Sequence, residues 1–132
     1  HNVYSVESLL DSLPKYLEYD RLILVAGFSR DKNVRGMAQA LLKKADVIYA
    51  TASRHPRSLT PAEVSGLFAD SRKIVSEAPT PAEALKMALD TAGDKDLVLA
   101  TGSLFLTAEV RESVLGIEPE IYPELPTLGS SV

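Results

Sequence analysis

The feature that most constrains the fold is a regular alternation between short apolar runs and segments with helical periodicity. Four apolar runs bounded by polar residues predict strands at 21–28, 46–51, 72–77 and 96–101. Apolar spacings of three and four predict helices near 4–19, 33–45 and 103–114, and capping motifs predict two more that start near 61 and 81. Strands that alternate with helices favour a mainly parallel sheet. We therefore predict an α/β, Rossmann-like three-layer sandwich with helices on both faces of the sheet.

Two of the helix starts carry the same capping signature. The motifs Thr60-Pro61-Ala62-Glu63 and Thr80-Pro81-Ala82-Glu83 each place Thr before the helix, Pro at its first position and Glu at its third. Thr and Glu at this spacing form a capping box, and Pro lacks the N–H group that would be unpaired there. In the first helix, Pro14 predicts a kink or break because its ring crowds the carbonyl of Leu10.

The length of the chain, 132 residues, suits one domain with its own core. We assign this domain to residues 1–116 and a proline-rich tail to 117–132, which has no period and is expected to be extended or without fixed structure. The chain begins with His1 and opens on a helix, without the strand that should precede it. We therefore expect it to be a fragment of a longer protein.

Composition excludes several classes of partner. A net charge of -4 argues against nucleic acid, which usually requires a basic face. No apolar run approaches the roughly 20 residues of a membrane span, so no membrane partner is predicted. The absence of cysteine excludes disulfides and thiolate chemistry. A cytoplasmic location is the default expectation.

Several cofactor motifs are missing from the sequence. There is no G-x-x-x-x-G-K-[ST] phosphate loop, and no G-x-G-x-x-G follows a strand, so neither nucleotide motif is present. The two histidines and the scattered carboxylates have no metal-ligand spacing, so no metal site is predicted.

Cationic residues concentrate in loops that should meet at one edge of the sheet. In an open parallel sheet, ligands bind beyond the carboxyl ends of the strands, near a reversal of strand order. The loops 29–33, 52–58 and 101–103 follow three of the predicted strands. Their basic residues are Arg30, Lys32, Arg54, His55 and Arg57. This clustering favours an anionic ligand.

The last of these loops, Thr101-Gly102-Ser103, joins a strand to a helix through small residues. Ser103 can act simply as a helix cap, or the first N–H groups of the helix can receive an anion. Structural alternatives also stand for the other loops: Asp31 can cap the helix near Asn33, and the loop 52–58 can be a solvated surface.

Longer stretches add a family resemblance. The segments "LILVAGFSRDKNV", "ATASRHPRSL" and "LVLATGSLFLTAEVR", with "HN" at the start, resemble the carboxy-terminal domain of folylpolyglutamate synthase and of its bifunctional dihydrofolate synthase form. These enzymes belong to the Mur-ligase-like family of ATP-dependent amide-forming ligases. The resemblance covers residues 1 to about 114, and its most specific parts are "TGSLFLTAEVR" and the segment from Gly27 to Lys32.

The resemblance implies a function for the full-length protein. In this family an amino-terminal P-loop domain binds ATP and Mg²⁺, the carboxylate of the folate is phosphorylated, and the amine of L-glutamate attacks the acyl phosphate. The chain would then supply the glutamate-binding half. It would bind no cofactor on its own and would be inactive without the amino-terminal ATPase domain, because half a site cannot orient both reactants.

The resemblance also implies roles for individual residues. Lys32 and Ser103 match positions that contact glutamate, and Gly102 allows close backbone approach. His1, the catalytic candidate, and Asn2 match the end of an Asp-Gly-Ala-His-Asn turn at the interdomain cleft. The further candidates for the cleft and its ATP side are Asp31, Arg57 and Ser58. Asn33 departs from the family, which more often has Asp there.

Two alternatives remain open at this point. One is a Mur-type ligase domain that adds an amino acid to a peptidoglycan precursor, although "TGSLFLTAEVR" favours the folate branch. The other is a non-catalytic α/β module that binds a small anion or a nucleotide.

Overall fold

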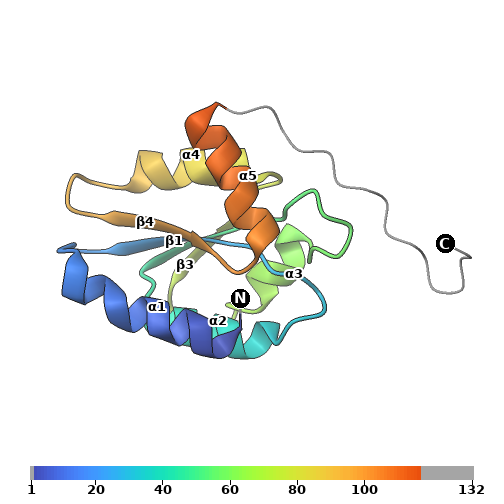
Figure 1. The fold of residues 1–132 in the computed structure, drawn as a ribbon, viewed down its shortest axis with the longest axis horizontal. Coiled ribbons are helices and arrows are strands. Elements are labelled where there is room, and N and C mark those ends of the chain that lie inside the picture. Colours follow the sequence, from blue (N-terminus) through green and yellow to red (C-terminus); the bar gives the residue numbers. More distant parts are fainter. Residues whose placement is uncertain (1, 117–132) are drawn as a thin grey trace, which may run out of the picture.

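Helices and strands alternate along the described part of the chain, residues 2–116, in the order that the sequence predicts (Figure 1). In this computed structural model the elements are α1 (Val3–Tyr16), β1 (Leu22–Ala26), α2 (Val34–Leu42), β2 (Val47–Ala50), α3 (Pro61–Gly66), β3 (Ile74–Glu77), α4 (Pro81–Thr91), β4 (Leu97–Thr101) and α5 (Leu104–Leu115). The predicted tail at 117–132 lies outside the described residues.

The strands of the described chain form one parallel sheet in the order β3-β2-β1-β4. Ala26 at the end of β1 is paired with Ala50 of β2 and with Thr101 of β4, so these three strands end side by side. The chain moves outward from β1 to β3 and then returns to the other side of β1. This reversal of strand order between β1 and β4 is where a doubly wound sheet is expected to bind ligands.

The two faces of β1 enter different parts of the core, which confirms the predicted layers. Leu22, Leu24 and Ala26 pack with residues of α1, α2 and α3. Ile23 and Val25 pack with α4 and with partly buried residues of α5 and β4. All residues of β1 are buried, as its continuous apolar run predicts.

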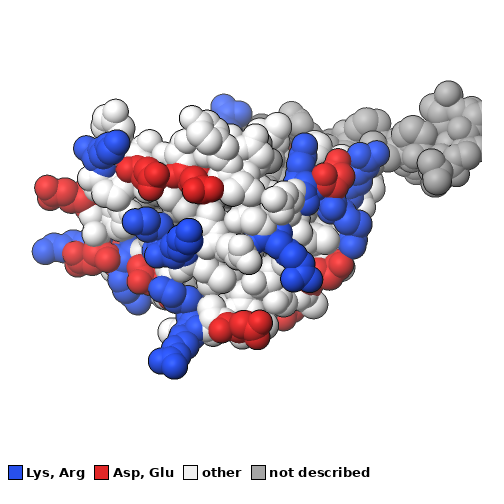
Figure 2. All heavy atoms as spheres, turned by 90° about the horizontal axis from the view of Figure 1, so that it is seen from below, with Lys and Arg blue, Asp and Glu red and all other residues white. Residues whose placement is uncertain are grey.

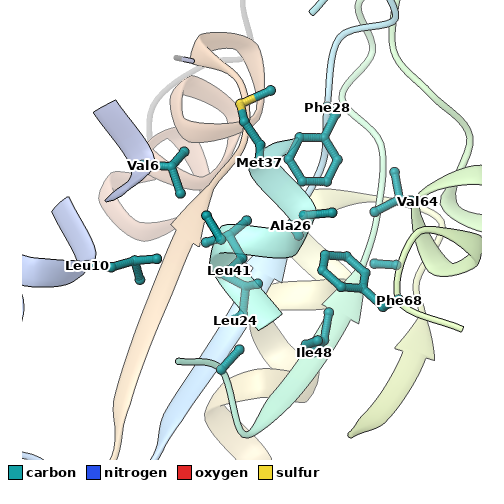
Figure 3. Close-up of a cluster of buried hydrophobic side chains, with 14 of the residues drawn as sticks. Val6, Leu10, Leu24, Ala26, Phe28, Met37, Leu41, Ile48, Val64 and Phe68 are labelled. Atoms are coloured by element: carbon teal, nitrogen blue, oxygen red, sulfur yellow. The ribbon is translucent and has the colours of Figure 1, made fainter. Parts of the chain in front are cut away.

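Figure 3 shows the first of these clusters, where side chains from three helices meet the sheet. Met37 and Leu41 of α2 belong to the same cluster as Val6 and Leu10 of α1. Phe68 approaches Phe28 with a separation of 6.4 Å between ring centroids. The packing anchors Phe28 at the end of β1. The loop that follows therefore starts from a fixed position.

Helix starts follow the predicted capping chemistry. Thr60 forms a complete capping box with Glu63, and the Thr80 hydroxyl accepts the N–H of Glu83, which is the threonine half of the same device. The first helix runs through Pro14 without a break and ends at Tyr16, three residues before the predicted end.

Charged side chains are mixed on the face that carries α1 and α2. Figure 2 shows basic and acidic side chains interspersed toward both ends of this face, with a largely uncharged surface between them. Among residues 2–116, no helix is long and apolar enough to cross a lipid bilayer.

Candidate functional site

A pocket opens at the carboxyl edge of the sheet, where the strand order reverses. It has a volume of 290 Å³ and is formed by the loops after β1, β2 and β4. We call it the edge pocket; its lining residues are Ser29, Asp31, Lys32, Arg57, Gly102, Ser103, Leu104 and Phe105. Five of these were predicted as site residues from the sequence. The structure therefore brings Lys32 and Ser103 to the same pocket.

Gly102 makes the close contact between the loops after β1 and β4. Its φ is +124°, and a Cβ atom at this position would lie 2.1 Å from the carbonyl oxygen of Gly27. Only a residue without a side chain fits such an approach. Gly102 thus allows the start of α5 to lie directly beside the end of β1.

Ser103 is the N-cap of α5. Its hydroxyl oxygen accepts the N–H of Leu106 at 3.0 Å, and the residue is 5% exposed. A serine hydroxyl that accepts a hydrogen bond still has its own proton to donate. Capping and anion contact are therefore compatible, and the positive end of the α5 dipole faces the same place.

Lys32 is the cation of the edge pocket that has no ion-pair partner among residues 2–116. It is exposed, and its backbone N–H donates to the carbonyl of Ser29 at 3.2 Å. This turn places Lys32 at the pocket, where its ammonium group can meet a ligand carboxylate.

Arg57 and Asp31 form an ion pair across the pocket. The distance from Nη1 of Arg57 to Oδ2 of Asp31 is 3.2 Å, and the two side chains are 57% and 49% exposed. Exposed pairs of this kind contribute little to stability and exchange partners readily. With Lys32, the lining carries two cations and one carboxylate, so its net charge is positive.

The structure corrects one alternative for Asp31. The cap of α2 is Asn33, whose side chain accepts the N–H of Gly36 at 3.1 Å. Asp31 instead forms an ion pair with Arg57, which lies in the loop after β2.

The loop 52–58 is not simply a solvated surface. It is joined to the loop after β1 by an antiparallel bridge between Ser29 and Ser58, and the carbonyl of Arg57 accepts the N–H of Arg30 at 2.7 Å. The Ser58 hydroxyl is hydrogen-bonded to that of Ser53. Ser58 therefore supports the loop and does not line the edge pocket.

Another predicted residue, Asn2, is also outside the edge pocket. Asn2 is the N-cap of α1, and its side chain accepts the N–H of Ser5 at 2.8 Å. His1 lies outside the described residues.

Arg30, one of the predicted loop cations, points to α3. Its guanidinium donates to both carboxylate oxygens of Glu63 at 2.9 and 2.8 Å. This hydrogen bonding, with that from the Thr60 backbone, lowers the pKa of Glu63 from 4.5 to about 2. The pair joins the loop after β1 to α3.

Three lining residues were not singled out from the sequence. Ser29 lies in the loop after β1, and Leu104 and Phe105 are the first residues of α5, directly after Ser103. Leu104 is 68% exposed although it is apolar, and the Phe105 ring stacks on His55 with a centroid distance of 3.8 Å. Their place in the sequence next to Ser103 would have been a signal, because apolar residues at a site suit the carbon chain of a small ligand.

Comparisons with known proteins agree with this architecture. The family described as Mur ligase, glutamate ligase domain, matches residues 1–104. The chain therefore belongs to the Mur ligase family, whose members are ATP-dependent amide ligases. No curated protein sequence matches the chain.

Solved structures of folate ligases are similar to the chain. Escherichia coli FolC in complex with DHPP and ADP is 24% identical with a TM-score of 0.80, over 88% of this chain and 27% of that protein. The bifunctional folylpolyglutamate synthase/dihydrofolate synthase of Yersinia pestis, complexed with AMPPNP and Mn ion, is 21% identical with a TM-score of 0.76, over the same shares. At these identities the two matches show the fold.

Mycobacterium tuberculosis folylpolyglutamate synthase, complexed with ADP and AMPPCP, is 26% identical with a TM-score of 0.73, over 91% of this chain and 29% of that protein. The chain thus spans less than a third of the length of these proteins.

Proposed function

We propose that this domain binds L-glutamate in the edge pocket and presents its amine to a folate acyl phosphate that a separate ATPase domain of the same protein generates. The observation that carries the proposal is the meeting of Lys32, Ser103 and Gly102 at one pocket. Membership of the Mur ligase family and the similarity to FolC support an amide-forming reaction.

The chemistry of the pocket suits a small dicarboxylate. One carboxylate is received by Lys32, and the other by the Ser103 hydroxyl and the amino-terminal end of α5. Arg57 can exchange its contact with Asp31 for a ligand carboxylate, because both side chains are about half exposed. Asp31 then remains as an acceptor for the ammonium group of the amino acid.

The size of the pocket points to an amino acid more than to a folate. Its volume of 290 Å³ is at the lower end of ordinary ligand cavities, which measure about 300–1,000 Å³. The folate would therefore lie mainly against the other domain. In the reaction, the amine nitrogen forms a bond to the acyl carbon, the bond from carbon to phosphate oxygen breaks, and phosphate leaves with a proton released to solvent.

The nucleotide and its metal are assigned to the rest of the protein. The sequence has no P-loop, and residues 2–116 contain no group of three or more His, Cys, Asp or Glu that could hold a metal ion. ATP and Mg²⁺ would thus be bound mainly by the amino-terminal domain. His1 and Asn2 would lie at the junction with it.

The test is glutamate-dependent release of ADP by the full-length protein with a panel of folates. Lys32→Ala and Ser103→Ala are each expected to raise the KM for glutamate by about tenfold or more, as expected for loss of a charge-assisted contact. Lys86→Ala is the control, since Lys86 is an exposed lysine of α4 that does not line the edge pocket.

Unchanged glutamate dependence in both pocket variants would overturn the site assignment. Activity with a peptidoglycan precursor and no activity with any folate would overturn the choice of acceptor. The 132-residue chain by itself is expected to show no ATP binding by calorimetry, and millimolar or tighter binding would contradict the assignment of ATP to another domain.

A further inference from the structure

Glu109 is the buried charged residue of the described chain. It lies in the middle of α5 and is 3% exposed, whereas the exposed Leu104 of the same helix is 68% exposed. A buried carboxylate is costly unless it is paired and hydrogen-bonded. Its contacts therefore indicate what it does.

Both oxygens of the Glu109 carboxylate contact Arg54 in the loop after β2. Oε2 accepts the backbone N–H of Arg54 at 2.8 Å, and Oε1 lies 3.3 Å from Nη1 of the same residue. Glu112, about one helical turn further along α5, contacts the guanidinium group of Arg54 at 3.3 Å. Glu109 thus contacts the backbone of the loop as well as the Arg54 side chain.

The same loop makes a second contact with α5. The His55 ring stacks on Phe105 with an angle of 15° between the ring planes. Phe105 and Glu109 are four residues apart and therefore lie on one side of the helix. Two consecutive loop residues are held by two consecutive turns of α5.

The contacts continue from there to the edge pocket. The N–H of Arg57 donates to Nδ1 of His55 at 3.2 Å, and Arg57 lines the pocket with Phe105 and Ser103. The loop and the first half of α5 therefore form one wall of the pocket. The distance between the Arg57 guanidinium and the Ser103 hydroxyl depends on how this wall is assembled.

We propose that Glu109 is a positioning residue for amino-acid binding: its buried carboxylate holds the backbone at Arg54 and thereby places Arg57 opposite Ser103. The proposal rests on the proposed function of the edge pocket. It adds a residue that does not touch the ligand but sets the spacing between two groups that receive it.

The experiment compares Glu109→Ala and Glu109→Gln in the full-length enzyme, with and without Arg57→Ala. Glu109→Ala is expected to raise the KM for glutamate by about tenfold, with a smaller change in kcat and none in the KM for ATP. Glu109→Gln keeps an acceptor for the Arg54 N–H and should recover part of the loss. In the Arg57→Ala background, Glu109→Ala should add less than about twofold, because the two residues act through one contact.

Asp96→Ala provides the matched control for a general loss of stability. Asp96 also pairs its carboxylate with an arginine and has a side chain that is only 7% exposed, but it lies at the opposite end of the sheet. The proposal is overturned if Glu109→Ala leaves the KM for glutamate unchanged, if its effect is equally large without Arg57, or if Asp96→Ala raises that KM equally.

These outcomes are separate from a failure of the proposed function. If Lys32→Ala and Ser103→Ala raise the KM for glutamate and Glu109→Ala does not, the positioning role fails and the pocket assignment stands. If none of the three changes this KM, the pocket assignment itself fails.

Discussion

Each end of the sheet has a pair formed by a carboxylate and an arginine, and the two pairs have different roles. At the amino end, Asp96 pairs with Arg21 at 2.7 Å, and their side chains are 7% and 46% exposed. At the carboxyl end, Glu109 pairs with Arg54 at 3.3 Å, with exposures of 3% and 44%. In both pairs the carboxylate also accepts the backbone N–H of its arginine.

The difference lies in what each pair holds. Arg21 and Asp96 directly precede β1 and β4, whose backbones are already joined, for example by the N–H of Leu97 to the carbonyl of Arg21 at 2.9 Å. The strand ladder fixes their position, so the pair adds stability. Arg54 and Glu109 join a loop to a helix that has no strand pairing with it. There the pair sets the position of the loop relative to α5.

The largest expected effect comes from adding a side chain at Gly102, where the loops after β1 and β4 contact each other. Gly102→Ala should destabilise the fold by about 2–5 kcal/mol, because it combines a positive φ with overlap of the Gly27 carbonyl. Urea-induced unfolding measures the change. Gly116→Ala is the matched control, since Gly116 has a φ of +66° but no atom within 4 Å of the added Cβ, and it should cost about 1 kcal/mol. Equal losses for both variants would show that the backbone near Gly102 adapts.

An intermediate effect is expected on amide hydrogen exchange, which should increase in different segments when one or the other arginine pair is removed. Glu109→Ala is expected to speed amide hydrogen exchange in residues 52–58 by about tenfold, while Asp96→Ala should speed exchange near Arg21 and Gly93 instead. Exchange followed by mass spectrometry tests this division. If either variant loosens both ends alike, the two pairs are not independent.

The smallest expected effect is a pH dependence at the amino end. Hydrogen bonds from Arg21, and then from the backbone of Gly93, lower the pKa of Asp96 below its ordinary value of 3.8. The contribution of Asp96 to stability is therefore complete above about pH 4 and is lost as the pH falls through its lower folded-state pKa. Asp96→Asn should thus flatten the acid side of the curve of unfolding free energy against pH.

Glu63, whose pKa is lowered to about 2, is the comparison for that experiment. Glu63→Gln should reduce the dependence between about pH 4.5 and 2 without altering the strand ends. A curve for Asp96→Asn that superimposes on that of the parent protein would contradict the assigned role of the pair.

Much of the fold could be predicted because its signals are local. The continuous apolar run of β1, the threonine caps of α3 and α4, and the serine cap of α5 depend on residues a few positions apart. The gathering of Lys32, Arg57 and Ser103 followed from one general rule, that parallel strands end at a common edge. The family resemblance supplied the identity of the expected ligand.

What could not be predicted depends on partners far apart in the sequence. Asp31 and Asn33 are both good helix caps, and the choice between them is linked to Arg57, 26 residues from Asp31. In α5 the hydrophobic pattern is misleading, because Leu104 is exposed while Glu109 is buried against Arg54, 55 residues away. Such positions are set by tertiary contacts that periodicity does not contain.

The position of β4 beside β1 has a consequence for how the site comes into being. The loops after β1 and β2 can associate as soon as those strands pair, but Gly102 and Ser103 arrive with the last strand of the described chain. During synthesis, a chain that has emerged only as far as β3 would already have three of the four described strands but would lack Gly102 and Ser103 of the edge pocket. Under the proposed function, glutamate binding would therefore require β4 to be in place.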